Sequence, residues 1–341
     1  MMTPTTDSTP DISIVIPTYN RCRQLESVLT ALLAQDTGGA TYEVIVVDNN
    51  SHDGTRAVVE KAMASDSSGL IRYVFEPRQG ISYARNTGVQ RSRAPIIAFL
   101  DDDGVPVRTW VREAKRAFDV YPQVDCIGGR VRAHRDTQRP SWLTHAHAGP
   151  VALQDRPHVQ WVNRSSASAC LIGANLAIRR AVFDEVGGFS PDYPRNQDRE
   201  FEMRMWEAGK LGVYLPTMDV IVEIPEERLT KRYHRKWQAT TGRYHALLRF
   251  RDRVDGGGRL HDGEGNIRRF LGTPLFLYRS FLHHIAGWCG AVLRGDHDDR
   301  FFHETRLWYF MAFVWTRFRT DVLPQLRAGS FRRALVGRTE T

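Results

Sequence analysis

Cysteine is scarce in this chain of 341 residues, and no glycine-rich phosphate loop follows its first apolar run. The four cysteines are scattered singly, so neither a disulfide framework nor a cysteine-based zinc site is expected. Residues 1–10 are polar and lack the basic and apolar regions of a secretory signal peptide. We therefore expect a protein of the reducing cytoplasm.

The chain also lacks a long hydrophobic run that is free of charge. Its most apolar stretches are residues 270–293, interrupted by Arg279 and two histidines, and residues 301–320, which carry charged side chains throughout. Such stretches favour helices that lie in a membrane interface over helices that span a bilayer. A buried helical cap or a dimer contact is the alternative interpretation.

The chain is rich in positive charge, and its composition is otherwise typical of a globular protein. With 42% hydrophobic and 25% charged residues, the chain can bury a sizeable core. Its formal net charge of +8 favours an anionic partner. A nucleotide diphosphate, an acidic lipid surface and a nucleic acid all fit that sign, so charge alone does not choose among them.

The first 130 residues alternate apolar runs with amphipathic stretches. The runs that read as strands are residues 12–16, 42–47, 71–75 and 96–100. This alternation predicts an α/β fold with a mostly parallel central sheet. Polar or acidic residues follow every run, and parallel strands place these ends along one edge. We therefore expect the four loops to converge on a single cleft.

Three consecutive carboxylates, Asp101, Asp102 and Asp103, follow directly on the fourth apolar run. Negative charge crowded at a sheet's carboxyl edge favours a bound cation. Carboxylate oxygens suit a hard divalent cation, such as Mg²⁺ or Mn²⁺. The alternative is that the acids only cap a helix over residues 107–118.

Four motifs follow one another along the chain: Val15 to Arg21, Val46 to Thr55, Ala84 to Gly88, and Phe99 to Asp103. In this order they resemble the motifs of family 2 glycosyltransferases, which have the GT-A fold, over roughly residues 11–230. Each motif is weak alone, but their order and spacing together are specific.

The resemblance implies roles for individual residues. Asp48 would contact the nucleotide base, and the aspartate triplet, a DXD motif, would bind the donor diphosphate through a divalent metal. Asp103 is the expected metal ligand, with Asp101 and Glu223 as further candidates, and Asp102 is directed at the ribose or sugar. The residues expected to bind the nucleotide and donor are Pro17, Tyr19, Asn20, Arg21, Asp48, Asn50, Arg85, Asp101 and Asp102.

Several of these residues also have plain structural interpretations. The segment that begins at Asp48 suits a turn by its residue types. Arg85 could be a solvated helix residue. Glu223 stands where the family often has a histidine, and it could be an oxygen ligand or an unrelated edge-strand residue.

A second acidic position lies far along the chain, where Asn196-Gln197-Asp198 heads an amphipathic helix that ends at Gly209. By resemblance Asp198 falls on the catalytic base, which would remove a proton from the acceptor hydroxyl opposite the departing diphosphate. Family members commonly have Glu where this chain has Gln197. The structural alternative for Asp198 is a helix N-cap.

Composition changes beyond residue 226. Residues 228–253 are basic and amphipathic, which predicts one helix, and aromatic stretches follow. We predict a disordered N-terminus over 1–10, a GT-A catalytic domain over 11–226, and a basic and aromatic helical extension over 227–341. The catalytic domain would comprise a nucleotide-binding half, 11–130, and an acceptor and catalytic half, 131–226.

These features predict an inverting enzyme that moves a hexosyl or related sugar from a nucleotide-diphosphate sugar to a hydroxyl of a glycan or lipid-linked acceptor, as in polysaccharide biosynthesis. Peripheral attachment at the inner face of the cell membrane is expected through the C-terminal helices. The alternative is a non-catalytic nucleotide-sugar-binding or scaffold protein. A nucleotidyltransferase would need a glycine-rich loop after the first strand, and the acidic cleft argues against nucleic acid. Donor, acceptor, linkage and oligomeric state stay open.

Overall fold

The computed structural model describes residues 9–255, 257–261 and 267–328. The chain divides into two compact units. Unit 1 comprises Met1–Arg135, Leu153–Asn163 and Cys170–Glu223, and unit 2 comprises Asp136–Ala152, Arg164–Ala169 and Ile224–Thr341. Most of the expected disordered N-terminus lies outside the described residues, and the domain boundary at residue 226 stays a prediction.

Unit 1 is built on a nine-stranded sheet in the order β3-β2-β1-β4-β8-β6-β9-β5, with β7 paired to β9. Strands β3, β2, β1 and β4 are mutually parallel, whereas β8 runs antiparallel to both β4 and β6. The predicted α/β class with a mostly parallel sheet is confirmed. The strands are β1 (Ile12–Thr18), β2 (Tyr42–Asp48), β3 (Ile71–Phe75), β4 (Ile96–Leu100), β5 (Gly104–Pro106), β6 (Cys126–Ala133), β7 (Gln160–Val162), β8 (Asn175–Arg179) and β9 (Gly212–Val222).

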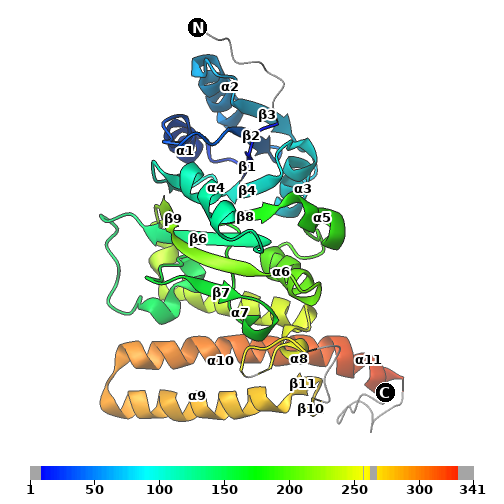
Figure 1. Ribbon diagram of the computed structural model, residues 1–341. Coiled ribbons are helices and arrows are strands. Elements are labelled where there is room, and N and C mark those ends of the chain that lie inside the picture. The colour runs from blue at the N-terminus through cyan, green and yellow to red at the C-terminus, as the bar shows by residue number, and fades with distance from the viewer. Residues whose placement is uncertain (1–8, 256, 262–266, 329–341) are drawn as a thin grey trace. The chain divides into compact units, whose positions relative to one another are not determined.

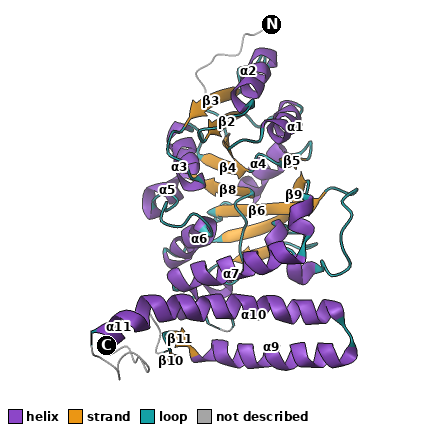
Figure 2. Ribbon diagram, turned by 180° about the vertical axis from the view of Figure 1, so that it is seen from behind, coloured by secondary structure: helices purple, strands orange, loops and turns teal. Residues whose placement is uncertain are grey.

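Helices cover both faces of this sheet, as Figures 1 and 2 show. Ile14 and its alternate neighbours on β1 join the core with one set of helices, while Val15 faces the other set. A Cβ on Gly88 would lie 2.2 Å from Val15 Cγ1, so only glycine lets α3 pack this closely on β1. The helices of unit 1 are α1 (Cys22–Leu33), α2 (Thr55–Ser65), α3 (Ile81–Arg91), α4 (Trp110–Val120), α5 (Arg180–Val186) and α6 (Gln197–Glu207).

Unit 2 is mainly helical. The basic stretch expected as one helix forms two, because the backbone turns through the left-handed region at Arg249 (φ 52°). The elements of unit 2 are α7 (Lys231–Leu247), α8 (Phe250–Arg253), β10 (Arg269–Phe270), β11 (Thr273–Pro274), α9 (Leu275–Arg294), α10 (His297–Arg317), a π-helical turn (Phe318–Val322), α11 (Leu323–Arg327) and single 3₁₀ turns at His145–His147, Gly149–Val151, Arg164–Ser166 and Glu226–Leu229.

A buried ion network holds the end of α10 in place. Arg317, 1% exposed, contacts Asp252 at 3.0 Å and donates to the carbonyl oxygen of Gly272 at 2.8 Å. Arg269 contacts the other oxygen of Asp252 at 3.0 Å. Removing one partner would leave a buried charge uncompensated, so the network is costly to disrupt. Within the described residues, no helix combines the length and the apolar content needed to cross a bilayer.

Helices α7 and α10 approach closely at Gly242, which predicts a large effect of a small substitution. A Cβ at Gly242 would lie 2.2 Å from the carbonyl oxygen of Tyr309, and backbone cannot rotate away as a side chain can. We expect Gly242→Ala to lower the free energy of unfolding by about 3 kcal/mol, measured by urea denaturation. Gly290→Ala is the control, because its Cβ would meet only the flexible end of Arg294 at 3.1 Å. Equal stability of the two variants would contradict the close approach.

Candidate active site

The loops after the parallel strands meet at one edge of the sheet. In the strand register, Thr18 at the end of β1 pairs with Asp48 at the end of β2, and Asp48 pairs with Phe75 at the end of β3. Strand β4 lies on the other side of β1, with Phe99 opposite Val15. Asp48 therefore ends β2 and the acidic triplet follows β4, and these two strands lie on either side of β1.

The triplet does not cap a helix. Strand β5 follows it immediately, and α4 begins only at Trp110, with Thr109 as its N-cap. The helix-cap interpretation is therefore wrong. Instead, the Arg21 guanidinium forms a short hydrogen bond with Asp103 and lies 3.8 Å from Asp102. Burial raises the pKa of Asp102 to about 7, despite the opposing effect of Arg21.

Asp101 is held by a buried arginine. Arg85, 2% exposed, lies with Nη2 3.4 Å from Asp101 and 3.1 Å from the carbonyl oxygen of Gly173. Its guanidinium packs on the rings of Phe99 and Phe189, 5.8 Å and 5.3 Å from their centroids. Arg85 is thus not a solvated helix residue, and its Nε and Nη1 donors have no hydrogen-bond partner in the structure.

The segment before β8 links the triplet to the second half of the site. The backbone N–H of Asp101 donates to the carbonyl oxygen of Ala174 at 3.3 Å. Three residues earlier, the N–H of Leu171 donates to Glu202 on α6 at 2.6 Å. Glu202 lies one helical turn after Asp198, so a short path of hydrogen bonds joins the helix that carries Asp198 to the aspartate triplet.

Asp198 lies in the first turn of α6, close to the triplet. The N-cap of α6 is Asn196, in the left-handed region at φ 61°, and not Asp198 as the structural alternative supposed. Burial raises the pKa of Asp101, and the negative charges of Asp103 and Asp198 raise it further. The effect of one charge on another weakens with distance. Together with the hydrogen bonds that link α6 to the segment before β8, it indicates that α6 and the triplet lie in one region of unit 1.

Glu202 is a site residue that sequence reasoning missed. It is 1% exposed, its Oε2 has no hydrogen-bond partner in the structure, and Arg199 lies 3.7 Å from that atom. Burial raises the pKa of Glu202 to about 7. Its position four residues after Asp198 was the available signal, because residues i and i+4 of a helix share a face.

Glu202 makes protein stability depend on pH. The folded chain holds the Glu202 proton up to about pH 7, whereas the unfolded chain releases it near its ordinary pKa, about 4. This group's contribution to stability therefore falls as pH rises from about 4 to about 7. The variant Glu202→Gln cannot ionise at this position. Its gain in unfolding free energy over wild type should therefore be about 3 kcal/mol larger at about pH 8 than at about pH 4. Urea denaturation measures the difference, and a gain independent of pH would contradict a buried, protonated Glu202.

The carboxylate of Asp48 is buried and ordered by two donors. The N–H of Ser51 donates to one oxygen at 2.9 Å, and the Tyr73 hydroxyl donates to the other at 2.8 Å. Burial and this bond raise the pKa of Tyr73 to about 12. Asp48 thus combines the turn role that its sequence suggested with a position at the sheet edge where β1, β2 and β3 end, and Tyr73 is a second residue that sequence reasoning missed.

The remaining predicted donor residues differ in their surroundings. Asn20 binds the loop after β2, since its Oδ1 accepts from the N–H of His52 at 2.8 Å and its own N–H donates to Ser51 at 3.0 Å. Asn50 lies in the left-handed region at φ 64°. Pro17 is buried within β1, whereas the Tyr19 ring is exposed and free to contact a ligand.

The pairing of β5 with β9 brings Glu223 to the same strand end as the triplet. Val222, the last residue of β9, pairs with Gly104, so the residues that flank this pair, Glu223 and Asp103, are brought to the same end of the two strands. Among the described residues, no group of three or more His, Cys, Asp or Glu side chains is arranged as a metal site. Mg²⁺ commonly takes only one or two protein carboxylates, so the crowded triplet still suits such an ion.

Known proteins match this chain in sequence and in fold. The profile described as Glycosyl transferase family 2 matches residues 13–187. The glycosyltransferase AglE of Haloferax volcanii is 29% identical over 60% of this chain and 64% of its own length. A glucosyl-dolichyl phosphate glucuronosyltransferase of the same organism is 25% identical over 56% of this chain and 59% of its own length. The chain thus spans less than two thirds of these relatives.

Solved structures match almost the whole chain in fold. The mannosyltransferase PcManGT of Pyrobaculum calidifontis, in complex with GDP-Man and Mn²⁺, has a TM-score of 0.58 at 18% identity and covers 94% of this chain and 90% of its own. The S. aureus TarS fragment 1–349 in complex with UDP-GlcNAc has a TM-score of 0.53 at 15% identity over 94% of this chain and 92% of that one. Likeness at this identity shows the GT-A fold alone. Because the profile matches residues 13–187, which include strands β1 to β4 and the acidic triplet, the chain belongs to glycosyltransferase family 2.

Proposed function

We propose that the chain is an inverting glycosyltransferase, which moves a sugar from a nucleotide-diphosphate sugar to an acceptor hydroxyl. The observation that carries the proposal is the hydrogen-bonded link between α6, which bears Asp198, and the segment that binds Asp101, near the sheet edge where strands β1, β2 and β4 end. A base and a diphosphate-binding group in one cleft are what a single displacement at the anomeric carbon requires.

In this proposal Asp198 accepts the proton of the acceptor hydroxyl as its oxygen attacks the anomeric carbon. The bond from that carbon to the diphosphate breaks on the opposite face, and the diphosphate leaves with the electron pair. Asp198 suits the role because it lies at the start of α6, which is anchored through Glu202 to the segment that also binds Asp101. Arg85, with unused donors, keeps that segment in place.

The triplet and its neighbours would receive the donor. Asp103, with Asp101 and Glu223 as further candidates, would hold Mg²⁺ or Mn²⁺, which would neutralise the charge that develops on the diphosphate. Burial raises the pKa values of Asp101 and Asp102, and the neighbouring carboxylates raise them further, so a bound cation would favour the ionised form of both groups. Asp48 would accept from the nucleotide base, with Asn20, Arg21 and Asn50 along the same edge.

Donor and acceptor classes rest on the likeness to named proteins. One structural neighbour is titled with GDP-Man and another with UDP-GlcNAc, and one curated relative is named for a glucosyl-dolichyl phosphate. We propose a nucleotide-diphosphate hexose as donor and a lipid-linked or glycan hydroxyl as acceptor.

We also propose that unit 2 attaches peripherally to the inner face of the cell membrane. Helix α9 contains no Asp or Glu and has Arg279 and Arg294 as its only Arg or Lys residues. Large apolar side chains are exposed at helical spacing on both α9 and α10, which suits an acidic membrane interface. These side chains are Leu282, Ile285, Trp288 and Val292 on α9, and Trp308, Met311 and Trp315 on α10.

A donor screen tests the proposed activity. The purified chain is incubated with uridine, guanosine and thymidine diphosphate sugars, with and without Mn²⁺, and thermal unfolding is followed. One nucleotide class should raise the melting temperature, more so with Mn²⁺, because a ligand that binds only the folded state stabilises it. Release of the nucleoside diphosphate from that donor when a candidate acceptor is added then measures transfer. No shift with any donor would contradict the proposal.

A further inference from the structure

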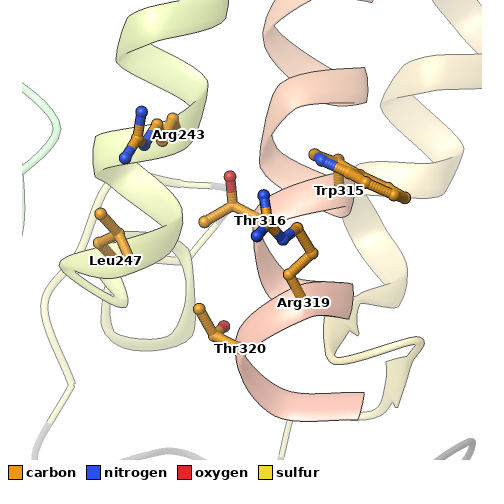
Figure 3. A pocket seen from close by; sticks show the side chains of 6 residues that line it. All are labelled: Arg243, Leu247, Trp315, Thr316, Arg319 and Thr320. Atoms are coloured by element: carbon orange, nitrogen blue, oxygen red, sulfur yellow. The ribbon is translucent and has the colours of Figure 1, made fainter. Parts of the chain in front are cut away.

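A pocket of about 440 Å³ lies within unit 2, between the C-terminal half of α7 and the end of α10 (Figure 3). It is distinct from the site in unit 1, and every residue that lines it belongs to unit 2. Its volume falls in the range of small-molecule sites. The lining residues are Arg243 and Leu247 from α7, and Trp315, Thr316, Arg319 and Thr320 from α10 and the π-helical turn that follows it.

The pocket is built into the packing of the two helices. Gly242, next to Arg243, brings α7 within contact of the backbone of Tyr309 on α10. Two turns further along α10, the buried Arg317 is fixed by Asp252, so the turn after it cannot drift. Arg319 and Thr320 lie in the π-helical turn, a distortion that often occurs at functional sites.

The two arginines of the pocket have unused hydrogen-bonding capacity. Within the described part of the chain, neither the Arg243 nor the Arg319 guanidinium has an ion-pair or hydrogen-bond partner, and Arg243 only lies over the Tyr244 ring at 5.9 Å. Asp321, two residues after Arg319, is already paired with Arg249 and Arg317, each at 3.1 Å. The pocket therefore carries two uncompensated positive charges.

We propose that this pocket binds the phosphate group of an anionic phospholipid at the membrane surface. Guanidinium groups match phosphate oxygens in geometry and charge, which identifies the ligand as a phosphate ester. The Trp315 side chain, 61% exposed, and the exposed Leu247 add an apolar rim, and tryptophan favours the headgroup level of a bilayer. A free phosphate ion would make no use of that rim, so the lipid is the better-matched source.

The inference rests on the proposed membrane attachment and adds a defined headgroup site to it. The test is sedimentation of the full chain with vesicles of phosphatidylcholine alone and with vesicles that contain phosphatidylglycerol. Wild type should bind the anionic vesicles more tightly. The double variant Arg243→Gln/Arg319→Gln should bind them about 30-fold more weakly, as expected for the loss of two guanidinium–phosphate contacts within the pocket. Both side chains are exposed, so an unchanged melting temperature shows that the variant is folded.

The matched control is Arg232→Gln/Lys236→Gln, which removes two exposed positive charges from α7 outside the pocket. This control should retain most of the binding. Equal losses in both double variants would indicate a diffuse basic surface and overturn the pocket, while membrane attachment would stand. Absence of wild-type binding to either vesicle would overturn the attachment as well.

Two competing ligands are separated in the same series. If inorganic phosphate displaces the wild type from anionic vesicles as well as soluble dihexanoyl phosphatidylglycerol does, the site is one for free phosphate and the lipid assignment is wrong. If the wild type instead binds a single-stranded RNA in a salt-sensitive manner that the Arg243/Arg319 variant loses, and binds no vesicle, nucleic acid replaces lipid as the ligand.

Discussion

Asp198→Asn is expected to reduce turnover by about 10³-fold while leaving donor affinity unchanged. Asn is nearly the same size as Asp and can still accept a hydrogen bond from the N–H of Arg199, now made at 2.9 Å, but it cannot take a proton from the acceptor. Turnover is measured as release of the nucleoside diphosphate with acceptor present, and donor affinity by calorimetry.

Two outcomes of this experiment are informative against the proposal. Asp192→Asn, an exposed carboxylate in the loop before α6, is the matched control and should retain full turnover. If Asp198→Asn also retained turnover, Asp198 would not be the base. If wild type bound donor but showed no turnover with any acceptor, the alternative of a non-catalytic nucleotide-sugar-binding protein would gain support. Gln197, where family members commonly have Glu, is the sequence feature that motivates this alternative.

Asp103→Asn is expected to weaken Mn²⁺-dependent donor binding by about 100-fold or more, because loss of a metal-binding carboxylate removes both charge and a ligand atom. The neutral side chain also breaks the ion pair with Arg21, which then faces Asp102 alone. The measurement is calorimetric titration of the donor with and without Mn²⁺. The difference between the two conditions should be large for wild type and small for the variant.

The control for this second prediction is Asp119→Asn, an exposed carboxylate on α4 that pairs with Lys115. It should leave the Mn²⁺ dependence intact. If Asp103→Asn bound donor as wild type does, with the same gain from Mn²⁺, the ligand would have to be another acid, and Asp101 or Glu223 would be tested next. A loss of donor affinity that is equal with and without Mn²⁺ would assign Asp103 to the donor itself.

The strands of the parallel sheet are the elements that the local sequence pattern predicts best. A buried parallel strand must be apolar on both faces, so the runs at 12–16, 42–47, 71–75 and 96–100 could be recognised, and each lies within an observed strand. The polar residues that follow these runs could be placed on one sheet edge by the parallel topology alone. The helical extension was harder, because the backbone break at Arg249 has no compositional signature.

The sequence by itself therefore determined the fold class, the family and the order of acids along one sheet edge, because hydrophobic period and strand-end chemistry are properties of adjacent residues. Tertiary structure decided the rest. It buried Arg85 against Phe99 and Phe189, set Tyr73 on Asp48, linked Glu202 to Leu171, and brought Arg243 and Arg319 to one pocket. Each pairing joins residues distant in the chain, and only the packing of helices and strands fixes such distances.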